Sequence, residues 1–477
     1  MALIPFVGSA YTSRSVNFDA QRTVNFYLTK SETGDSKTKT ALVGTAGTSI
    51  FCTIPELLGR GAHECLGRAF EVFGGGLYEI FSDATYIKRG TLSTTSGFVS
   101  MDDNGTQLCI VDGPNGYILD LTTNTFSAIT DPYFLGATTV AFIDGYFMFN
   151  KPNSGIYYIS ALYNGLTGDP LDFASAEGSP DNLVGIITLH KEAWLFGANT
   201  IEVVYDSGDA DFPFRRIQGA FIEYGCSAPH SIAKTANTVF WLGQDKFGNG
   251  VVWMANGYAP QRISTHAIEY AIQKYGDLSD AISYTYQEDG HYFYVLNFTN
   301  ANTTWVYDIG ENEWHERADF DSSTGLFKRN RPQNHIFVFN KHLVADYENG
   351  NLYEQNLNIY TNNSNVIRRM RRAQHLSDDL QFMYYSKLQI DMETGVGLLT
   401  GGAQDTDPQL MLRWSDDGGH KWSNEHWQSA GKRGAYRWRA MWRRLGRSRD
   451  RIFELVVTAS CKMFILGAHA DIESGEN

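Results

Sequence analysis

The sequence has few cysteines and no apolar run long enough to cross a membrane. Its 477 residues include five cysteines, which are far apart and form no CxxC pair. An odd number of scattered cysteines indicates buried, reduced thiols in a protein made in the cytoplasm, without a structural zinc site. No apolar stretch approaches the roughly 20 residues of a transmembrane helix, so we expect no stable membrane insertion. The amino terminus has no basic residue before its short apolar run and does not resemble a secretory signal.

The sequence also lacks the short motifs of common enzyme classes. HExxH, GxSxG, Walker A and GxGxxG patterns are absent, so metalloprotease, hydrolase and nucleotide-binding functions are not indicated. The 12 histidines have no metal-ligand spacing. The run from Asp206 to Asp211 lacks the Gly and Glu of a calcium loop and is interpreted as a turn. We therefore expect no cofactor, no metal and no catalytic residue.

Glycine and aromatic residues are abundant, whereas proline is scarce. The chain has 46 glycines against 12 prolines, and 14% of its residues are aromatic. Many tight turns between short aromatic-rich strands are typical of an all-β fold. The length predicts two or three domains.

The stretch from Asn302 to Ala318 predicts a β-hairpin of a kind that recurs along the chain. Trp305 to Tyr307 are aromatic or β-branched, and the turn after them contains Gly310, which can take the positive φ that such turns often need. Similar strands recur every 39 to 54 residues. They are Leu77–Glu79, Tyr117–Leu119, Ile156–Tyr158, Ile201–Val203, Val251–Trp253, Trp305–Tyr307 and Leu352–Glu354.

A second strand precedes each member of this series. These strands are Phe70–Phe73, Gln107–Val111, Tyr146–Phe149, Ala193–Phe196, Val239–Leu242, Tyr292–Leu296 and His335–Phe339. A period of about 40 to 50 residues with about four strands per unit is typical of a β-propeller, and closing the units into a ring protects their edges. We expect a propeller of about seven blades over residues 46–365, with six or eight blades left open.

The sequence outside the repeats predicts an amino-terminal segment and one helix. Residues 1–45 are expected to form an N-terminal extended arm or a closing strand, and the sequence does not decide between these. One helix is predicted from Thr265 to Tyr275 as an insertion between blades. Ser264 or Thr265 can cap its start, and Gly276 is placed to end it.

Residues 366–477 are predicted to form a separate antiparallel β-sandwich domain that contains a basic strand. The character of the chain changes at 366–374, where four arginines replace the turn pattern. Strands are expected at Leu380–Glu393, Gln409–Ser415, Ala435–Leu445 and Ile452–Thr458.

Ser415 to Trp422 matches S-x-D-x-G-x-x-W, the Asp-box pattern of sialidase propellers. In that pattern the Ser and Asp side chains bond the backbone of a tight hairpin and the Trp packs beneath it. Ser415, Asp417, Gly419 and Trp422 are therefore interpreted as a structural turn. A glycosidase would also need carboxylates that converge in space, and no spacing singles out such a pair.

The strongest local signal is the basic run from Lys432 to Arg451. It has nine basic residues and one acidic residue, a charge of +8 in a chain of −14, which leaves −22 elsewhere. The alternation from Tyr436 to Arg443 predicts a half-buried strand with aromatic residues inward and guanidinium groups outward. Three interpretations stay open: a solvated face, docking against an acidic surface of another subunit, and sequence-independent contact with DNA phosphates. The candidate contact residues are Arg437, Arg439, Arg443, Arg444, Arg447 and Arg449.

Several stretches resemble the packaged-DNA stabilisation, or tail-hub, proteins of short-tailed bacteriophages. They are Trp194–Phe214, Val239–Ile272, Tyr294–Ala318 and Met441–Thr458, about a third of the chain. The resemblance implies a virion protein of the phage tail, made in the bacterial cytoplasm and added after genome packaging. It implies a ring, with six copies expected, that lies below the portal and adaptor, retains the packaged double-stranded DNA and continues its channel. A tail needle and fibres or spikes would attach to it.

The resemblance provides no catalytic residues, so we expect a structural protein and not an enzyme. The acidic composition is compatible with a channel wall along which DNA passes without adhering. Two alternatives remain: a propeller glycosidase that acts on host surface polysaccharide, and a receptor- or fibre-binding module.

Overall fold

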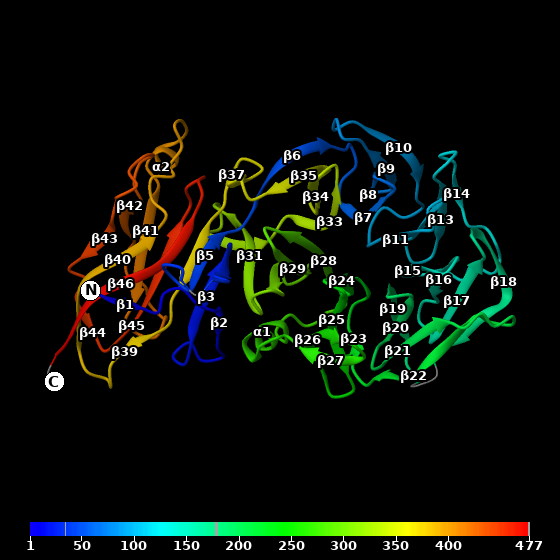
Figure 1. Ribbon diagram of the computed structural model, residues 1–477, viewed down its shortest axis with the longest axis horizontal. Coiled ribbons are helices and arrows are strands. Elements are labelled where there is room, and N and C mark those ends of the chain that lie inside the picture. The colour runs from blue at the N-terminus through cyan, green and yellow to red at the C-terminus, as the bar shows by residue number, and fades with distance from the viewer. Residues whose placement is uncertain (34, 177–179, 476–477) are drawn as a thin grey trace.

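Short antiparallel strands joined by tight turns build nearly the whole molecule. The computed structural model describes residues 1–33, 35–176 and 180–475. Figure 1 shows a propeller of radiating sheets on one side and a sandwich, drawn mainly in orange and red, on the other. The prediction of an all-β propeller with a C-terminal β-sandwich is confirmed.

Six sheets of the propeller are built from consecutive strands of the chain. The first sheet contains β7 (Gly59–Cys65), β8 (Arg68–Phe73), β9 (Gly76–Ile80) and β10 (Tyr86–Thr91). The second contains β11 (Ser100–Asp103), β12 (Gln107–Val111), β13 (Gly116–Asp120) and β14 (Phe126–Ala128). The third contains β15 (Val140–Ile143), β16 (Tyr146–Asn150), β17 (Ile156–Ala161) and β18 (Asn164–Ser175). The fourth sheet contains β19 (Leu183–Leu189), β20 (Glu192–Gly197), β21 (Ile201–Asp206) and β22 (Phe214–Ile222). The fifth contains β23 (Gly225–Cys226), β24 (Ala233–Thr235), β25 (Thr238–Asp245), β26 (Gly248–Asn256) and β27 (Ala259–Arg262). The sixth contains β28 (Ala281–Glu288), β29 (His291–Phe298), β30 (Thr303–Asp308) and β31 (Glu313–Asp321), with β32 (Leu326–Arg329) beside β31.

A composite sheet closes the ring. It joins β33 (Pro332–Val338), β34 (Lys341–Asp346) and β35 (Asn351–Asn356) to β6 (Gly47–Thr53), which comes from the start of the chain and runs antiparallel to β35. The short strands β36 (Thr361–Asn362) and β37 (Asn365–Val366) extend this sheet. The inner strands β7, β11, β15, β19, β24, β28 and β33 follow one another around the axis, and β33 adjoins β7.

Two local expectations within the propeller need correction. The strand before Leu352–Glu354 was expected at His335–Phe339, but that segment is the inner strand, and β34 intervenes. In the turn between β30 and β31 it is Asn312, at φ 56°, that takes the left-handed conformation expected of Gly310. An asparagine tolerates this region because its short polar side chain can bond locally, and the Asn312 Oδ1 accepts from Tyr307 Oη.

Residues 1–45 do not form an extended arm. Their strands are β1 (Ala2–Ile4), β2 (Tyr11–Thr12), β3 (Ala20–Val24), β4 (Phe26–Lys30) and β5 (Thr40–Gly44). β1 and β5 pair with β46 of the sandwich, whereas β3 lies between β31 of the propeller and β38. The segment is anchored because Phe6 and Phe26 belong to the sandwich core. Local sequence patterns do not indicate these pairings, since the partner strands in the propeller and the sandwich lie about 290 to 470 residues away.

The sandwich has two sheets. One contains β4, β5, β46 (Phe464–Ser474), β40 (Met383–Met392) and β43 (Ala440–Arg443), with β1 and β44 (Arg447–Ser448) beside it. The other contains β3, β38 (Arg369–Arg372), β45 (Asp450–Val457), β41 (Gln409–Ser415) and β42 (His426–Ser429), with β39 (Leu376–Ser377) beside β45. Leu388, Leu412, Phe453 and Ile465 pack between them.

The basic strand is shorter than the alternation predicted. β43 spans only Ala440–Arg443, and Tyr436 and Trp438 are 75% and 45% exposed, whereas Ala440 and Trp442 are buried. Turns at Gly431 (φ 92°) and Gly434 (φ 83°) break the extended backbone before β43. The inward direction expected of Tyr436 and Trp438 is therefore wrong.

The predicted helix is present as α1 (His266–Ile272), between β27 and β28, with the Thr265 side chain accepting from Ile268 N. A second helix, α2 (Ala403–Thr406), and the 3₁₀ turn η1 (Pro229–Ser231) are also short. No helix among the described residues has the length and apolar character required to span a membrane. All five cysteines are free and buried.

Candidate functional site

An exposed arginine surface covers one edge of the sandwich. Arg437 and Arg439 lie in the loop before β43, Arg443 ends that strand, and Arg444, Arg447 and Arg449 follow. All six side chains are exposed. Within the described part of the chain, none of the six forms an ion pair with a carboxylate. We call these six residues the arginine surface.

Part of the arginine surface lines an open depression of about 560 Å³. Tyr384, Lys387, Arg443, Arg444 and Arg447 contribute to its walls. Arg447 Nη1 donates to Tyr384 Oη at 3.3 Å. The guanidinium groups of Arg447 and Arg449 lie 4.6 and 4.5 Å from the centre of the Phe382 ring. Aromatic rings thus hold these two cations in place while their outer donors face solvent.

Arg451, the last basic residue of the run, has a different role. It is 1% exposed, and its Nε and Nη2 donate to the two carboxylate oxygens of Asp416 at 2.6 and 2.7 Å. Its Nη1 donates to Leu445 O at 2.6 Å. The bidentate pair fixes the turn after β41 and the bond to Leu445 O fixes the loop before β45, so Arg451 is structural.

Three aromatic side chains accompany the arginine surface. Trp427, on β42, is 50% exposed, and Tyr436 and Trp438 lie in the loop before β43. Trp438 Nε1 donates to Ser429 O at 2.7 Å, which holds the ring beside β42. Exposed Trp, Tyr and Arg together are the composition found at the centre of protein–protein interfaces.

The Asp-box segment forms a closed network of turn hydrogen bonds. Ser415 Oγ accepts from Gly419 N at 2.8 Å, and Asp417 Oδ1 accepts from the backbone N–H groups of His420 (3.0 Å) and Lys421 (2.8 Å). These bonds hold the Asp417 pKa below its ordinary value. Trp422 Nε1 donates to Gly419 O at 3.1 Å. The polar atoms of the motif are thus used within the turn itself.

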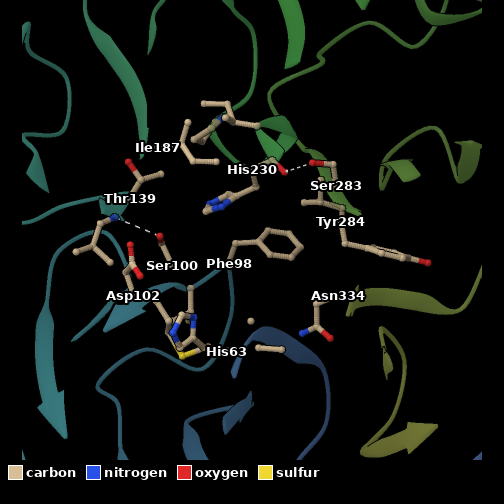
Figure 2. Close-up of a pocket in the computed structure, with 18 of the residues that line it drawn as sticks. His63, Phe98, Ser100, Asp102, Thr139, Ile187, His230, Ser283, Tyr284 and Asn334 are labelled. Carbon is tan, nitrogen blue, oxygen red and sulfur yellow. Dashed lines mark hydrogen bonds between the residues drawn. The ribbon is translucent and has the colours of Figure 1, made fainter. Parts of the chain in front are cut away.

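The propeller encloses a polar cavity on its axis, which Figure 2 shows. Its volume is about 330 Å³, and residues of all seven inner strands line it. It is far too small for a DNA duplex, whose major groove alone is about 12 Å wide. The axis of a single chain therefore cannot be a DNA channel.

The cavity contains a cluster of titratable groups that sequence reasoning missed. His63 Nε2, on β7, lies 2.8 Å from Asp103 Oδ2, on β11, and this contact counteracts burial and leaves the Asp103 pKa lowered. Burial raises the pKa of Asp102. Burial lowers the pKa of His230, on η1, to about 4, so its imidazole is neutral near pH 7. His63 lies 39 and 40 positions before the two aspartates and 167 positions before His230, and no short motif in the sequence joins them.

The two aspartates are not arranged as the carboxyl pair of a glycosidase. Such a pair flanks the scissile bond from two sides. Asp102 and Asp103 are neighbours on one strand, and both accept backbone N–H groups: Phe142 N to Asp102 Oδ2 at 2.7 Å and Gly105 N to Asp103 Oδ1 at 2.8 Å. Asp102 lines the cavity and Asp103 is the next residue of β11, so the two carboxylates do not face each other across a space for a sugar.

Comparison with solved structures gives distant likeness in fold. The extracellular domain of a hybrid two component system of B. thetaiotaomicron has a TM-score of 0.45 and 9% identity over 64% of this chain and 39% of its own. The Pan2 WD40 domain of Neurospora crassa has a TM-score of 0.43 and 6% identity over 65% of this chain and 94% of its own. This chain thus spans well under half of the first of these proteins.

Comparison with protein families gives a match over nearly the whole chain. The family described as "Bacteriophage P22 Gp10, beta-propeller" matches residues 2–360, and that described as "Bacteriophage P22 Gp10, beta-sandwich" matches residues 368–473. A search of curated proteins finds no match. The chain belongs to the bacteriophage P22 Gp10 family of phage stabilisation proteins and is therefore a structural protein of a bacteriophage.

Proposed function

We propose that the chain is the subunit of a tail-hub ring in the virion, attached below the portal and adaptor. The ring would retain the packaged DNA and continue the channel through which the genome leaves. Family membership supports a phage structural role, and the arginine surface is the observation that carries the proposal further. Six exposed arginines without carboxylate partners among the described residues offer the donors that an acidic partner surface would bind.

The partner that suits this surface best is a second copy or the adaptor. Guanidinium groups bind carboxylates with two parallel hydrogen bonds, and the chain outside the basic run carries a charge of −22. The exposed Trp427, Tyr436 and Trp438 would supply the apolar contacts that a stable interface needs. Contact between the arginine surface of one copy and an acidic surface of the next would close a ring, and six copies are proposed.

In this arrangement the DNA channel lies between the copies and not inside any propeller. The axial cavity of about 330 Å³ excludes a duplex, so a conduit has to be formed by the assembly. Acidic walls would repel phosphates and keep the genome mobile during ejection. A tail needle and fibres or spikes are proposed to attach to the outer faces of the ring.

The test is charge reversal of the arginine surface. We expect Arg437→Glu, Arg439→Glu and Arg443→Glu together to abolish ring formation on portal–adaptor complexes, because six units of charge change at one contact. Negative-stain microscopy and mass photometry measure the rings, and nuclease sensitivity of the packaged genome measures DNA retention. The control is Lys191→Glu, Lys246→Glu and Lys274→Glu, which makes the same charge change at exposed lysines of the propeller.

Two other outcomes would change the assignment. Rings that form normally but lose DNA would assign the arginine surface to phosphate contact. Normal rings with normal DNA retention would remove both roles from it.

A further inference from the structure

We propose that the propeller axis binds a divalent metal ion through His63, Asp102 and Asp103. One ligand atom from each of these side chains lies within 4.8 Å of the other two. His63 belongs to β7 and the aspartates to β11, so the site joins two neighbouring sheets of the propeller. This role is separate from the proposed contacts of the tail ring.

The distances suit a tetrahedral ion after a small movement. Metal–nitrogen and metal–oxygen bonds of about 2.0 to 2.2 Å place tetrahedral ligand atoms roughly 3.4 Å apart. His63 Nε2 and Asp103 Oδ2 are now 2.8 Å apart and share a hydrogen bond. They need to separate by about half an ångström. His63 releases its Nε2 proton to solvent, and the ion takes the position between the two atoms.

Backbone donors already orient both carboxylates. Gly105 N donates to Asp103 Oδ1 at 2.8 Å, Phe142 N donates to Asp102 Oδ2 at 2.7 Å, and Asp103 N donates to Asp102 Oδ1 at 3.0 Å. A carboxylate oxygen has two lone pairs, so these bonds leave capacity for an ion. Such outer hydrogen bonds are what positions metal-binding side chains in proteins.

Without an ion, His63 and the more distant Lys234 are the cations that act on Asp102. His63 is paired with Asp103, and Asp102 has no ion pair within the described residues. A divalent cation would compensate both carboxylates at once. Burying an uncompensated carboxylate beside a second one is costly, which favours cation binding in this position.

An independent observation is the imidazole of His230. Figure 2 shows it projecting from η1 into the same cavity, on the side of Ser100 and Asp102. Its ring packs 5.0 Å from Phe98, and no hydrogen bond to the ring is formed among the described residues. The side chain is half-buried, and its ring nitrogens are available to a partner inside the cavity. A water molecule bound to the ion would be such a partner.

The donor set indicates the class of metal. One imidazole nitrogen with carboxylate oxygens suits Zn²⁺, Co²⁺ or Mn²⁺, whereas Ca²⁺ and Mg²⁺ prefer oxygen ligands alone. Because the ion binds only the folded propeller, it would raise the unfolding temperature by mass action.

The experiment titrates the full-length chain with Co²⁺, followed by visible absorption and calorimetry, with Zn²⁺ as competitor. We expect one Co²⁺ per chain, an affinity at least about tenfold weaker in Asp102→Asn, and a raised unfolding temperature with Zn²⁺. The matched control is Asp450→Asn, because Asp450 pairs with His375 at 2.8 Å as Asp103 pairs with His63, but no second carboxylate among the described residues completes a metal-binding group there. His63→Gln provides a second variant if Asp102→Asn fails to fold.

Two results would overturn the proposal. One is the absence of stoichiometric Co²⁺ binding to the unaltered chain, which decides the matter whatever the variants do. The other is Co²⁺ affinity that is unchanged in a folded Asp102→Asn or His63→Gln. Neither result depends on whether the chain forms a tail ring.

Discussion

A buried arginine fastens the amino-terminal segment to the rest of the molecule, and its replacement by methionine tests that role. Arg371, on β38, donates from Nε to Phe6 O at 2.8 Å and from Nη2 to Gln21 Oε1 at 2.7 Å. Its Nη1 donates to Ser9 O at 3.0 Å and to Thr23 Oγ1 at 2.8 Å. It is fully buried and, among the described residues, has no carboxylate partner. Burial lowers its pKa to about 10, so it remains charged near pH 7.

The magnitude follows from these four bonds. A hydrogen bond from a charged donor contributes about 1.5 to 3 kcal/mol, so four contribute roughly 6 to 12 kcal/mol before any offset. Returning the guanidinium to water on unfolding offsets several kcal/mol of this. We therefore expect Arg371→Met to lower the free energy of opening of residues 6–23 by about 3 to 5 kcal/mol.

Trypsin cleavage after Arg22 measures that opening. In the folded chain Arg22 is held within β3 and donates to both carboxylate oxygens of Glu316, at 2.7 and 2.6 Å. When closing is fast, cleavage follows the open population, so the rate should rise about 100-fold to several thousand-fold. The control is Arg433→Met, at an exposed arginine. Cleavage of Arg371→Met at the rate of this control would refute the reasoning.

Two further predictions concern the closure of the propeller and its response to acid. A Cβ on Gly350 would collide with the backbone oxygens of Ile54 and Glu56, where β35 meets β6. Gly350→Ala should therefore lower the free energy of unfolding of the propeller by about 1 to 3 kcal/mol, as measured by urea unfolding. Gly248→Ala, which meets nothing within 4 Å, is the control, and equal effects would contradict the prediction. Burial and the neighbouring His342 lower the pKa of His335 from 6.5 to about 3. Between these two pH values the unfolded chain therefore binds more protons than the folded chain. The free energy of unfolding should fall as the pH decreases from about 6.5 towards 3. His335→Gln should flatten this decline in thermal unfolding, and an unchanged slope would show that other groups cause it.

The repeats were predictable because their signals are local. Each hairpin combines a strand of aromatic or β-branched residues with a turn of Gly, Asn or Asp, and such a unit forms wherever the pattern occurs. The strands predicted around Tyr78, Tyr117, Tyr157 and Tyr307 are therefore present in β9, β13, β17 and β30. The cap at Thr265 was predictable for the same reason.

The basic strand shows where a local pattern misleads. Its alternation of aromatic residues and arginines has the period of a half-buried strand, yet only Ala440 to Arg443 pairs with β40. Whether Tyr436 and Trp438 face a core depends on a partner strand, and no strand in the described part of the chain pairs with these residues. Period alone cannot supply that partner.

The sequence by itself determined the all-β class, the repeating hairpins and the strong basic run, since each depends on residues close together in the chain. Only the tertiary structure decided that β6 closes the ring, that β3 joins the propeller to the sandwich, and that His63, Asp102 and His230 meet on the axis. These pairings depend on which distant segments bury apolar surface together. Which segments pack together is determined by the whole folded chain, so no short stretch of the sequence indicates it.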